Sequence, residues 1–171
     1  MANKIIYGAT GAFKYLSNSR EIPNVTSIAL PDIEIPTSEI SGAGIMGTVD
    51  MPVPGQVNSM KITVTARATG ANKSALMSNK VSGEIRIAQN VRAQDGTLYV
   101  AGTRIYFVGS PTKLGGGNIE NLKTRDETVE YSVTRYREIV DGEETLLVDK
   151  FAGKFVADGI DLMSGVRSVL D

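Results

Sequence analysis

The sequence contains no histidine, no cysteine and no tryptophan, and aromatic residues make up only 6% of its 171 positions. Histidine supplies most general bases near neutral pH, and the cysteine thiolate is a strong nucleophile. These two residues also provide most protein ligands for zinc, copper and iron. We therefore expect no catalytic site, no metal centre and no bound cofactor. The lack of cysteine also excludes a disulfide framework.

Charge of either sign is not in excess, because 18 basic residues stand against 19 acidic residues. Proteins that grip nucleic acid or an anionic membrane usually carry a basic field. Tight phosphate binding is therefore not expected. The only apolar run in residues 1–7 is three residues long, too short for a signal peptide or a membrane span. We expect a chain that stays in the cytosol or is released by lysis, without inserting into a membrane by itself.

Length and composition predict a single folded domain over residues 1–171. A chain of this size can bury one core, and 42% hydrophobic with 22% charged residues is typical of globular proteins. We therefore expect that the protein is not an enzyme, since no set of residues in the sequence forms a recognisable catalytic site.

Strict alternation of apolar and polar residues is the strongest structural signal, and it predicts a mainly β fold. Residues 58–68 show it best, with Met60, Ile62 and Val64 on one face and Lys61 and Thr63 on the other. Further strands are predicted at residues 25–35, 83–89, 98–108, 128–140 and 145–155. Asp-Gly pairs at 95–96 and 141–142 predict hairpin turns.

The remaining segments are predicted as an arm, two loops and two helices. Residues 1–20 read as an N-terminal arm, and residues 36–56 and 109–126 as long loops rich in glycine and proline. A short inner helix is predicted at residues 72–79 and a terminal helix at residues 158–170. The loops hold apolar residues that need a partner to cover them, namely Ile40, Ile45, Met46 and Leu114. Closed self-association would cover both these residues and exposed strand edges.

One enzymatic interpretation starts from residues 4–13 (KIIYGATGAF), which look like the strand and glycine turn that open a nucleotide-binding unit. The turn would lie at Gly8–Gly11. Lys14 occupies the third glycine position, and no long helix follows. A glycine-rich arm is the simpler interpretation.

Three stretches of the chain carry a family resemblance. The first is residues 21–26 (EIPNVT) with the glycine-methionine-glycine loop at residues 42–49 (GAGIMGTV). The second is residues 123–131 (KTRDETVEY), leading through Tyr136 to the turn at residues 141–142. The third is residues 148–153 (VDKFAG) with residues 158–167 (DGIDLMSGVR). In this order and spacing, the chain resembles the major tail tube protein of contractile-tailed bacteriophages and of phage-tail-like bacteriocins.

The resemblance implies a tail-tube-type β-sandwich or barrel with long hairpins. Such a subunit forms hexameric rings that stack into a tube inside a contractile sheath, and two hairpins per subunit join a continuous barrel around the channel. The implied partners are copies of itself, the tail sheath protein, and baseplate and tail terminator proteins, with DNA in the lumen if the particle is a phage. The implied place is a virion tail or tail-like particle, assembled in the bacterial host cytoplasm.

Two surfaces follow as hypotheses. The polar strand faces predict a lumen lining of Lys61, Thr63, Thr65, Glu130, Ser132 and Thr134. The loop predicts a ring-to-ring contact at Ile40, Gly42, Gly44, Ile45, Met46 and Gly47. A tube protein of another contractile injection system, such as type VI secretion, is an alternative with the same architecture, and the nucleotide-binding enzyme is a distant one.

Overall fold

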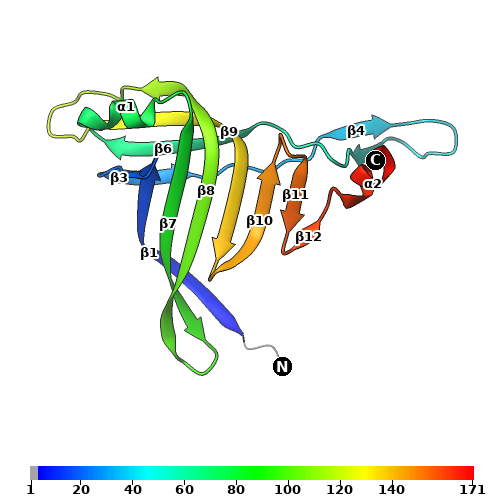
Figure 1. Cartoon of the computed structure of the whole chain (residues 1–171), viewed down its shortest axis with the longest axis horizontal. Coiled ribbons are helices and arrows are strands. Elements are labelled where there is room, and N and C mark those ends of the chain that lie inside the picture. The colour runs from blue at the N-terminus through cyan, green and yellow to red at the C-terminus, as the bar shows by residue number, and fades with distance from the viewer. Residues whose placement is uncertain (1–3) are drawn as a thin grey trace.

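The computed structural model describes residues 4–171, and within them it is built mainly of β-strands (Figure 1). Two short helices are also present. The elements run β1 (Ile5–Ser17), β2 (Arg20–Glu21), β3 (Val25–Ala29), β4 (Thr37–Ile40), β5 (Val49–Pro52), β6 (Met60–Arg67), a 3-10 turn (Gly70–Asn72), α1 (Lys73–Leu76), β7 (Val81–Ala93), β8 (Leu98–Gly115), β9 (Asp126–Val140), β10 (Glu143–Asp149), β11 (Lys154–Ala157), β12 (Ile160–Asp161) and α2 (Ser164–Leu170).

Ten of the described strands form one antiparallel sheet, in the order β12-β11-β10-β9-β8-β7-β1-β2, with β6 beside β9 and β3 beside β6. Strand β9 has β8 along one edge and two successive partners along the other. Its first half, from Asp126 to Val133, pairs with β6, and its second half, from Arg135 to Val140, pairs with β10. The sheet therefore divides at β9 into two layers.

The core lies between these layers, because the alternating residues of each strand point one set of side chains inward. On β6 the inward residues Met60, Ile62 and Val64 are at most 2% exposed, and on β9 Val129 and Tyr131 are equally buried. The residues between them face away from the core. The alternation in the sequence is thus confirmed as the division between core and surface.

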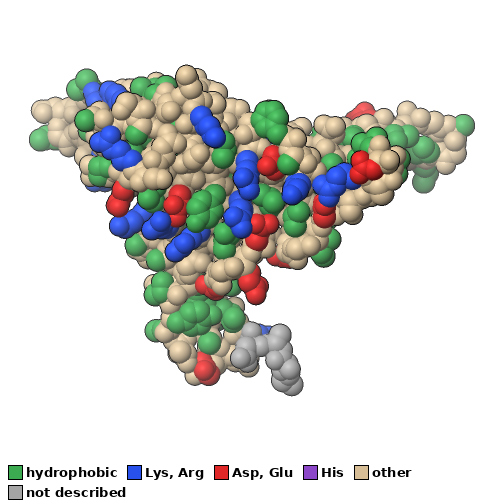
Figure 2. All heavy atoms as spheres, in the orientation of Figure 1, with side chains coloured by type: hydrophobic (Ala, Val, Ile, Leu, Met, Phe, Trp, Pro, Cys, Tyr) green, Lys and Arg blue, Asp and Glu red, His purple; other side chains and the backbone are tan. Residues whose placement is uncertain are grey.

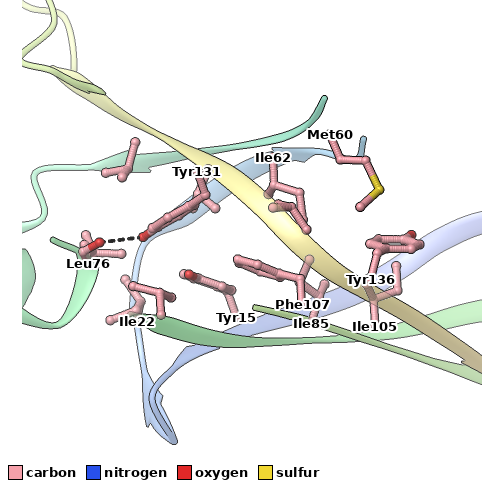
Figure 3. Close-up of a cluster of buried hydrophobic side chains, with 14 of the residues drawn as sticks. Tyr15, Ile22, Met60, Ile62, Leu76, Ile85, Ile105, Phe107, Tyr131 and Tyr136 are labelled. Carbon is pink, nitrogen blue, oxygen red and sulfur yellow. Dashed lines mark hydrogen bonds between the residues drawn. The ribbon is translucent and has the colours of Figure 1, made fainter. Parts of the chain in front are cut away.

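Three aromatic rings pack at the centre of the core (Figure 3). Tyr15 and Phe107 lie parallel with centroids 6.2 Å apart, and Tyr131 tilts against Phe107 at 5.6 Å. Burial raises the pKa of Tyr131, and its hydroxyl donates a 2.9 Å hydrogen bond to the carbonyl of Leu76. Gly83 leaves room for this packing, since a Cβ there would lie 2.1 Å from the Phe107 ring. Helix α1 is therefore held to the core through a buried phenol.

A buried carboxylate fixes the segment before α1. Glu127 on β9 is 2% exposed and accepts hydrogen bonds from both the backbone N–H and the hydroxyl of Thr69. Arg125 donates to its other oxygen at 2.6 Å, and the Lys73 ammonium lies 3.6 Å away. The hydroxyl and backbone hydrogen bonds from Thr69, with the two nearby cations, hold the pKa of Glu127 below its usual value. Both oxygens of the buried carboxylate therefore have hydrogen-bond donors or a cation beside them.

Most predicted strands and turns are confirmed. The alternating segments correspond to β6, β7, β8, β9 and β10, and the Asp-Gly pairs form the two hairpin turns. Gly96 and Gly142 take φ values of +89° and +85°, which glycine adopts without a steric cost. The short inner helix is also confirmed at Lys73–Leu76.

Six boundaries were wrong. The strand predicted at residues 25–35 ends at Ala29, and the strand predicted at residues 145–155 is divided into β10 and β11 by a turn at residues 150–153. The predicted arm at 1–20 is, from Ile5 onward, the long strand β1, which pairs with β7 inside the main sheet; residues 1–3 lie outside the described part of the chain. The loop predicted at 36–56 contains the β4–β5 hairpin, and the first seven residues of the loop predicted at 109–126, residues 109–115, belong to β8. The terminal helix starts at Ser164 rather than at residue 158. Glycine and proline content concealed these strands, because pairing with neighbours overrides local propensity.

The nucleotide-binding interpretation is also wrong, because Gly8 and Gly11 lie within β1 and no turn forms between them. A Cβ on Gly8 would approach the carbonyl oxygen of Asn90 to 3.1 Å, so this glycine serves close strand packing.

We expect Glu127→Gln to lower the free energy of unfolding by about 1–3 kcal/mol near neutral pH, since the amide loses its charge-assisted hydrogen bonds. A lowered folded-state pKa stabilises the fold above the unfolded-state pKa of the carboxyl group, and this stability disappears as the pH falls through the folded-state value. The difference between wild type and variant should therefore shrink toward acidic pH. Urea unfolding followed by far-UV circular dichroism at about pH 7 and about pH 3 measures both effects.

Glu143→Gln is the matched control, because Glu143 is exposed at the β9–β10 turn. Its effect should stay within about 0.5 kcal/mol. Equal effects of the two substitutions would contradict the role assigned to Glu127.

Candidate functional surfaces

A two-stranded hairpin projects from the body of the molecule at one end of its longest axis (Figure 1). This hairpin, made of β4, β5 and the residues between them, is called the arm below. It is a different segment from the N-terminal arm that was predicted at residues 1–20. Thr37 pairs with Pro52, Glu39 with Asp50 and Ile40 with Val49. An isolated two-stranded hairpin is only marginally stable in water.

One face of the arm carries exposed apolar side chains, and the other carries two carboxylates that lie opposite each other. Strand alternation places Ile40, Val49 and Met51 on one face, and Val49 and Met51 are 50% and 52% exposed. Glu39 and Asp50 face each other on the opposite face, where two like charges repel. The turn between the strands holds Ile45, 39% exposed, and Met46, which is fully exposed. The predicted contact residues at 40–47 thus lie in one hairpin, and all of them except the half-buried Ile40 are exposed in the free subunit.

Five of the six residues predicted to line a lumen share one face of β6 and the first half of β9. Lys61 pairs with Ser132, Thr63 with Glu130 and Thr65 with Thr128, all on the side away from the core. The Lys61 ammonium lies 3.0 Å from the Glu130 carboxylate. Thr134 follows on the same side of β9, and its hydroxyl donates to the carbonyl of Val108. This common face is a property of the strand register and does not show what it faces in an assembly.

A charged band crosses the same side of the sheet farther along, over β1, β7, β8, β9 and β10 (Figure 2). Sequence reasoning missed it because its members are far apart in the chain. Lys14 pairs with Arg86, and Arg86 with Arg104, so three basic residues stand in one row. The other basic members are Arg135 and Arg137.

Most basic residues of this band form an ion pair with a carboxylate. Arg86 contacts Glu84 at 2.6 Å, Arg137 contacts Glu144 at 2.5 Å, Lys14 contacts Glu21 at 3.3 Å and Arg135 contacts Asp149 at 3.8 Å. Neighbouring ion pairs of this kind leave little net field on the face. The band is therefore a balanced mosaic of charges and not a site for strong phosphate binding.

An apolar groove opens between β1, β7 and β3, near the end of the molecule opposite the arm. Its volume is about 360 Å³ and it carries no charged side chain; it is lined by Thr10, Phe13, Thr26, Ser27, Ile28, Leu30, Ile85 and Ile87. In this stretch β1 pairs with β7 on one edge, and β2 covers the other edge only at Leu16 and Ser17. The groove therefore lies beside an open strand edge.

A third apolar surface lies on the ribbon formed by the start of β1 and the β7–β8 hairpin. Ile6, Leu98 and Val100 are each 65% exposed or more. The predicted β7–β8 turn indicated the hairpin, but only the pairing of β1 with β7 adds Ile6 to the same surface. Such patches on a folded subunit mark contact sites.

Within residues 4–171, no group of three or more acidic side chains is arranged to hold a metal ion. Neither helix of this part of the chain is long and apolar enough to cross a membrane.

The fold and the sequence of this chain can be compared with those of known proteins. A search of curated proteins finds no match. The sheath/tube terminator of the extracellular contractile injection system PVC, in its extended state, has a TM-score of 0.51 and 18% identity, covering 75% of this chain and 94% of that chain. A chain of the PVC sheath-tube complex has a TM-score of 0.49 and 19% identity over 74% of this chain and 87% of its own. The first likeness shows a shared fold.

The family model for phage tail tube protein FII matches residues 11–170, nearly the whole sequence. The chain therefore belongs to the phage tail tube protein FII family and is a structural tube subunit.

Proposed function

We propose that copies of this subunit close into hexameric rings, and that the rings stack into the inner tube of a contractile phage tail or tail-like particle. The observation that carries the proposal is the set of surfaces that one copy leaves open: the arm, the groove beside β1 and the ribbon of β1, β7 and β8. Open strand edges and apolar patches are hazards in a monomer, and a closed ring of identical copies removes both.

In a phage, the channel of such a tube passes DNA. When the sheath contracts, the tube itself punctures the target envelope. Its wall is the side of the sheet that faces away from the core, with Lys61, Thr63, Thr65, Glu130, Ser132 and Thr134 as its first members. Beyond Thr134 the same side of β9 continues into Arg135 and Arg137. The pairing of their charges supports this role, because a wall of free cations would hold a polyanion through many phosphate contacts.

The arm supplies the contact between rings through Ile40, Gly42, Gly44, Ile45, Met46 and Gly47. Its projection from the body and the full exposure of Met46 support this assignment. The proposed partners besides other copies are a tail sheath protein, a baseplate and a terminator. The likeness to a sheath/tube terminator supports them at the level of the fold. Assembly would take place in the cytoplasm of the bacterial host.

The same fold serves a tube of another contractile injection system, such as type VI secretion. The likeness to a chain of the extracellular contractile injection system PVC supports another injection system as the second candidate. Nuclease-protected DNA inside purified particles would separate a phage tail from it.

We expect the purified protein to form rings and tubes with a central channel as its concentration rises. Negative-stain electron microscopy shows their shape, and light scattering follows the growth. Absence of a ring or tube at every concentration, even beside a preformed baseplate, would contradict the proposal.

The lumen wall has its own test, which uses the absence of native cysteine. We expect Ser132→Cys in assembled tubes to react with a small maleimide that enters the channel, and to be protected from a maleimide on a large polymer. Ser132 is exposed, so both reagents should react in the free subunit, which is the control. Rapid reaction of the tube with the large reagent would place Ser132 on the outer surface.

A further inference from the structure

Two segments that belong to no strand join the arm to the body, residues 30–36 before β4 and residues 53–59 after β5. Among the described strands β4 and β5 pair only with each other, so no sheet hydrogen bond ties the arm to the body. Two backbone hydrogen bonds of 2.8 Å join the segments to each other, Val53 to Pro36 and Asn58 to Glu34. The direction of the arm therefore depends on what these segments contact.

The ends of the two segments nearest the body are anchored. Ile33 and Val57 pack against the core, and the Lys150 ammonium donates a 2.8 Å hydrogen bond to the carbonyl of Asn58. Between Val57 and β5 the chain makes a tight turn over residues 53–56. We call this segment the hinge turn, because it lies between an anchored end and the projecting arm, where a change of backbone angles would swing the arm.

The backbone of the hinge turn requires glycine. Gly55 has a φ of +85°, and the N–H of Gln56 bonds to the carbonyl of Val53 at 3.4 Å. Pro54 followed by a glycine at positive φ is typical of a type II turn. This conformation presents the bare Cα of Gly55 to its neighbours, and a helix occupies the space beside it.

That helix is α2, which lies beside the base of the arm (Figure 1). A Cβ on Gly55 would lie 2.8 Å from the Cε of Met163 and 3.6 Å from a methyl group of Val166. Met163 and Val166 are half-buried, whereas Val169 and Leu170 farther along the helix are 84% and 79% exposed. The helix therefore packs one apolar pair on the hinge turn and leaves another in water.

Helix α2 is itself fastened to the body. The backbone N–H of Met163 donates to the carboxylate of Asp161 at 2.9 Å. Arg167 forms an ion pair with Asp161 and donates to the carbonyl of Gly153, in the β10–β11 turn, at 3.2 Å. A helix of seven residues is not stable by itself in water, so these contacts keep it in place. They make α2 a firm connection between the body and the hinge turn.

The other surroundings of the hinge turn are less tightly packed. A cleft of about 150 Å³ adjoins it, lined by Gly55, Gln56 and Met163 together with residues of β10 and β11. Protein interiors contain few voids of this size, and an unfilled space next to a turn gives it room to move. The contact with α2 is therefore the one that limits this movement.

From this geometry we infer that α2 is a clamp for the arm. Through Met163 and Val166 it holds the hinge turn in place, and so it fixes the direction in which the arm projects from the body. The clamp works within one chain. Its consequence for assembly rests on the proposed function: an arm that is already oriented loses less conformational freedom when it meets a partner, which strengthens the contact.

The distance between two spin labels in the free subunit tests the clamp. Ser41→Cys places one label in the arm and Ser132→Cys places the other on β9, and the chain has no native cysteine. Double electron–electron resonance is recorded below the concentration at which assembly begins. We expect Met163→Ala with Val166→Ala to widen the distance distribution at least twofold, while far-UV circular dichroism shows that the body stays folded.

The matched control is Val169→Ala with Leu170→Ala, which removes two apolar side chains from the exposed part of the same helix. It should keep the width of the wild type. An unchanged width in the Met163 and Val166 variant, or equal widening by both double variants, would overturn the inference. If the double variant does not fold, Met163→Ala is compared with Met163→Leu, which keeps an apolar side chain at the contact. Only the alanine variant should then widen the distribution, and equal widths would overturn the clamp.

The consequence for assembly has a separate measurement. We expect Met163→Ala with Val166→Ala to raise the concentration needed for assembly at least fivefold relative to the Val169 and Leu170 control, measured by light scattering. Equal concentrations beside a widened distance distribution would overturn this consequence. Failure of the wild type to assemble would contradict the proposed function, whereas the clamp is decided by the spin labels in the free subunit.

Discussion

Strand β9 is hydrogen-bonded on both edges, and one of these edges serves two partners in succession. This pairing is the constraint on which the other parts of the fold depend. Because β6 takes the first half and β10 the second, the sheet must divide near Thr134 and turn across itself. The core fills the space enclosed by this turn, and Tyr131 and Tyr136 enter it from either side of the division. Without the division, the strands would form one open sheet with one bare face.

The same constraint determines which surfaces remain unpaired. Once β9 is shared, β1 and β3 become edges on one side of the molecule, and the segment between β3 and β6 has no sheet position to fill. It leaves the body as the arm. A subunit built this way has a projecting strand pair at one end and an open edge at the other, and identical copies can satisfy both. The buried Glu127 and the phenol of Tyr131 keep α1 and the layers in place while these edges stay free.

Much of the fold could be predicted from local pattern. The alternation of Met60, Ile62 and Val64 identified a strand and its inward face, and Asp-Gly pairs located two turns, because strand period and turn conformation are properties of neighbouring residues. Strand β1 was missed, since Gly8 and Gly11 lower its intrinsic preference and only pairing with β7 makes it a strand. The polar face shared by Lys61 and Glu130 was predicted correctly as a face. The charged band and the groove were not predicted, because each joins residues of three or more segments that are separate in the chain.

The sequence by itself determined that this protein is β-rich and contains no histidine or cysteine, and that its order of motifs is that of a tail tube protein. Side-chain types and their periodicity suffice for these conclusions. Only the tertiary structure decided where the core ends, that Glu39 faces Asp50 on a projecting hairpin, and that Phe13, Ile28 and Leu30 meet in one groove. These relations depend on strand register and on the division at β9, and both are set by contacts between residues distant in the chain.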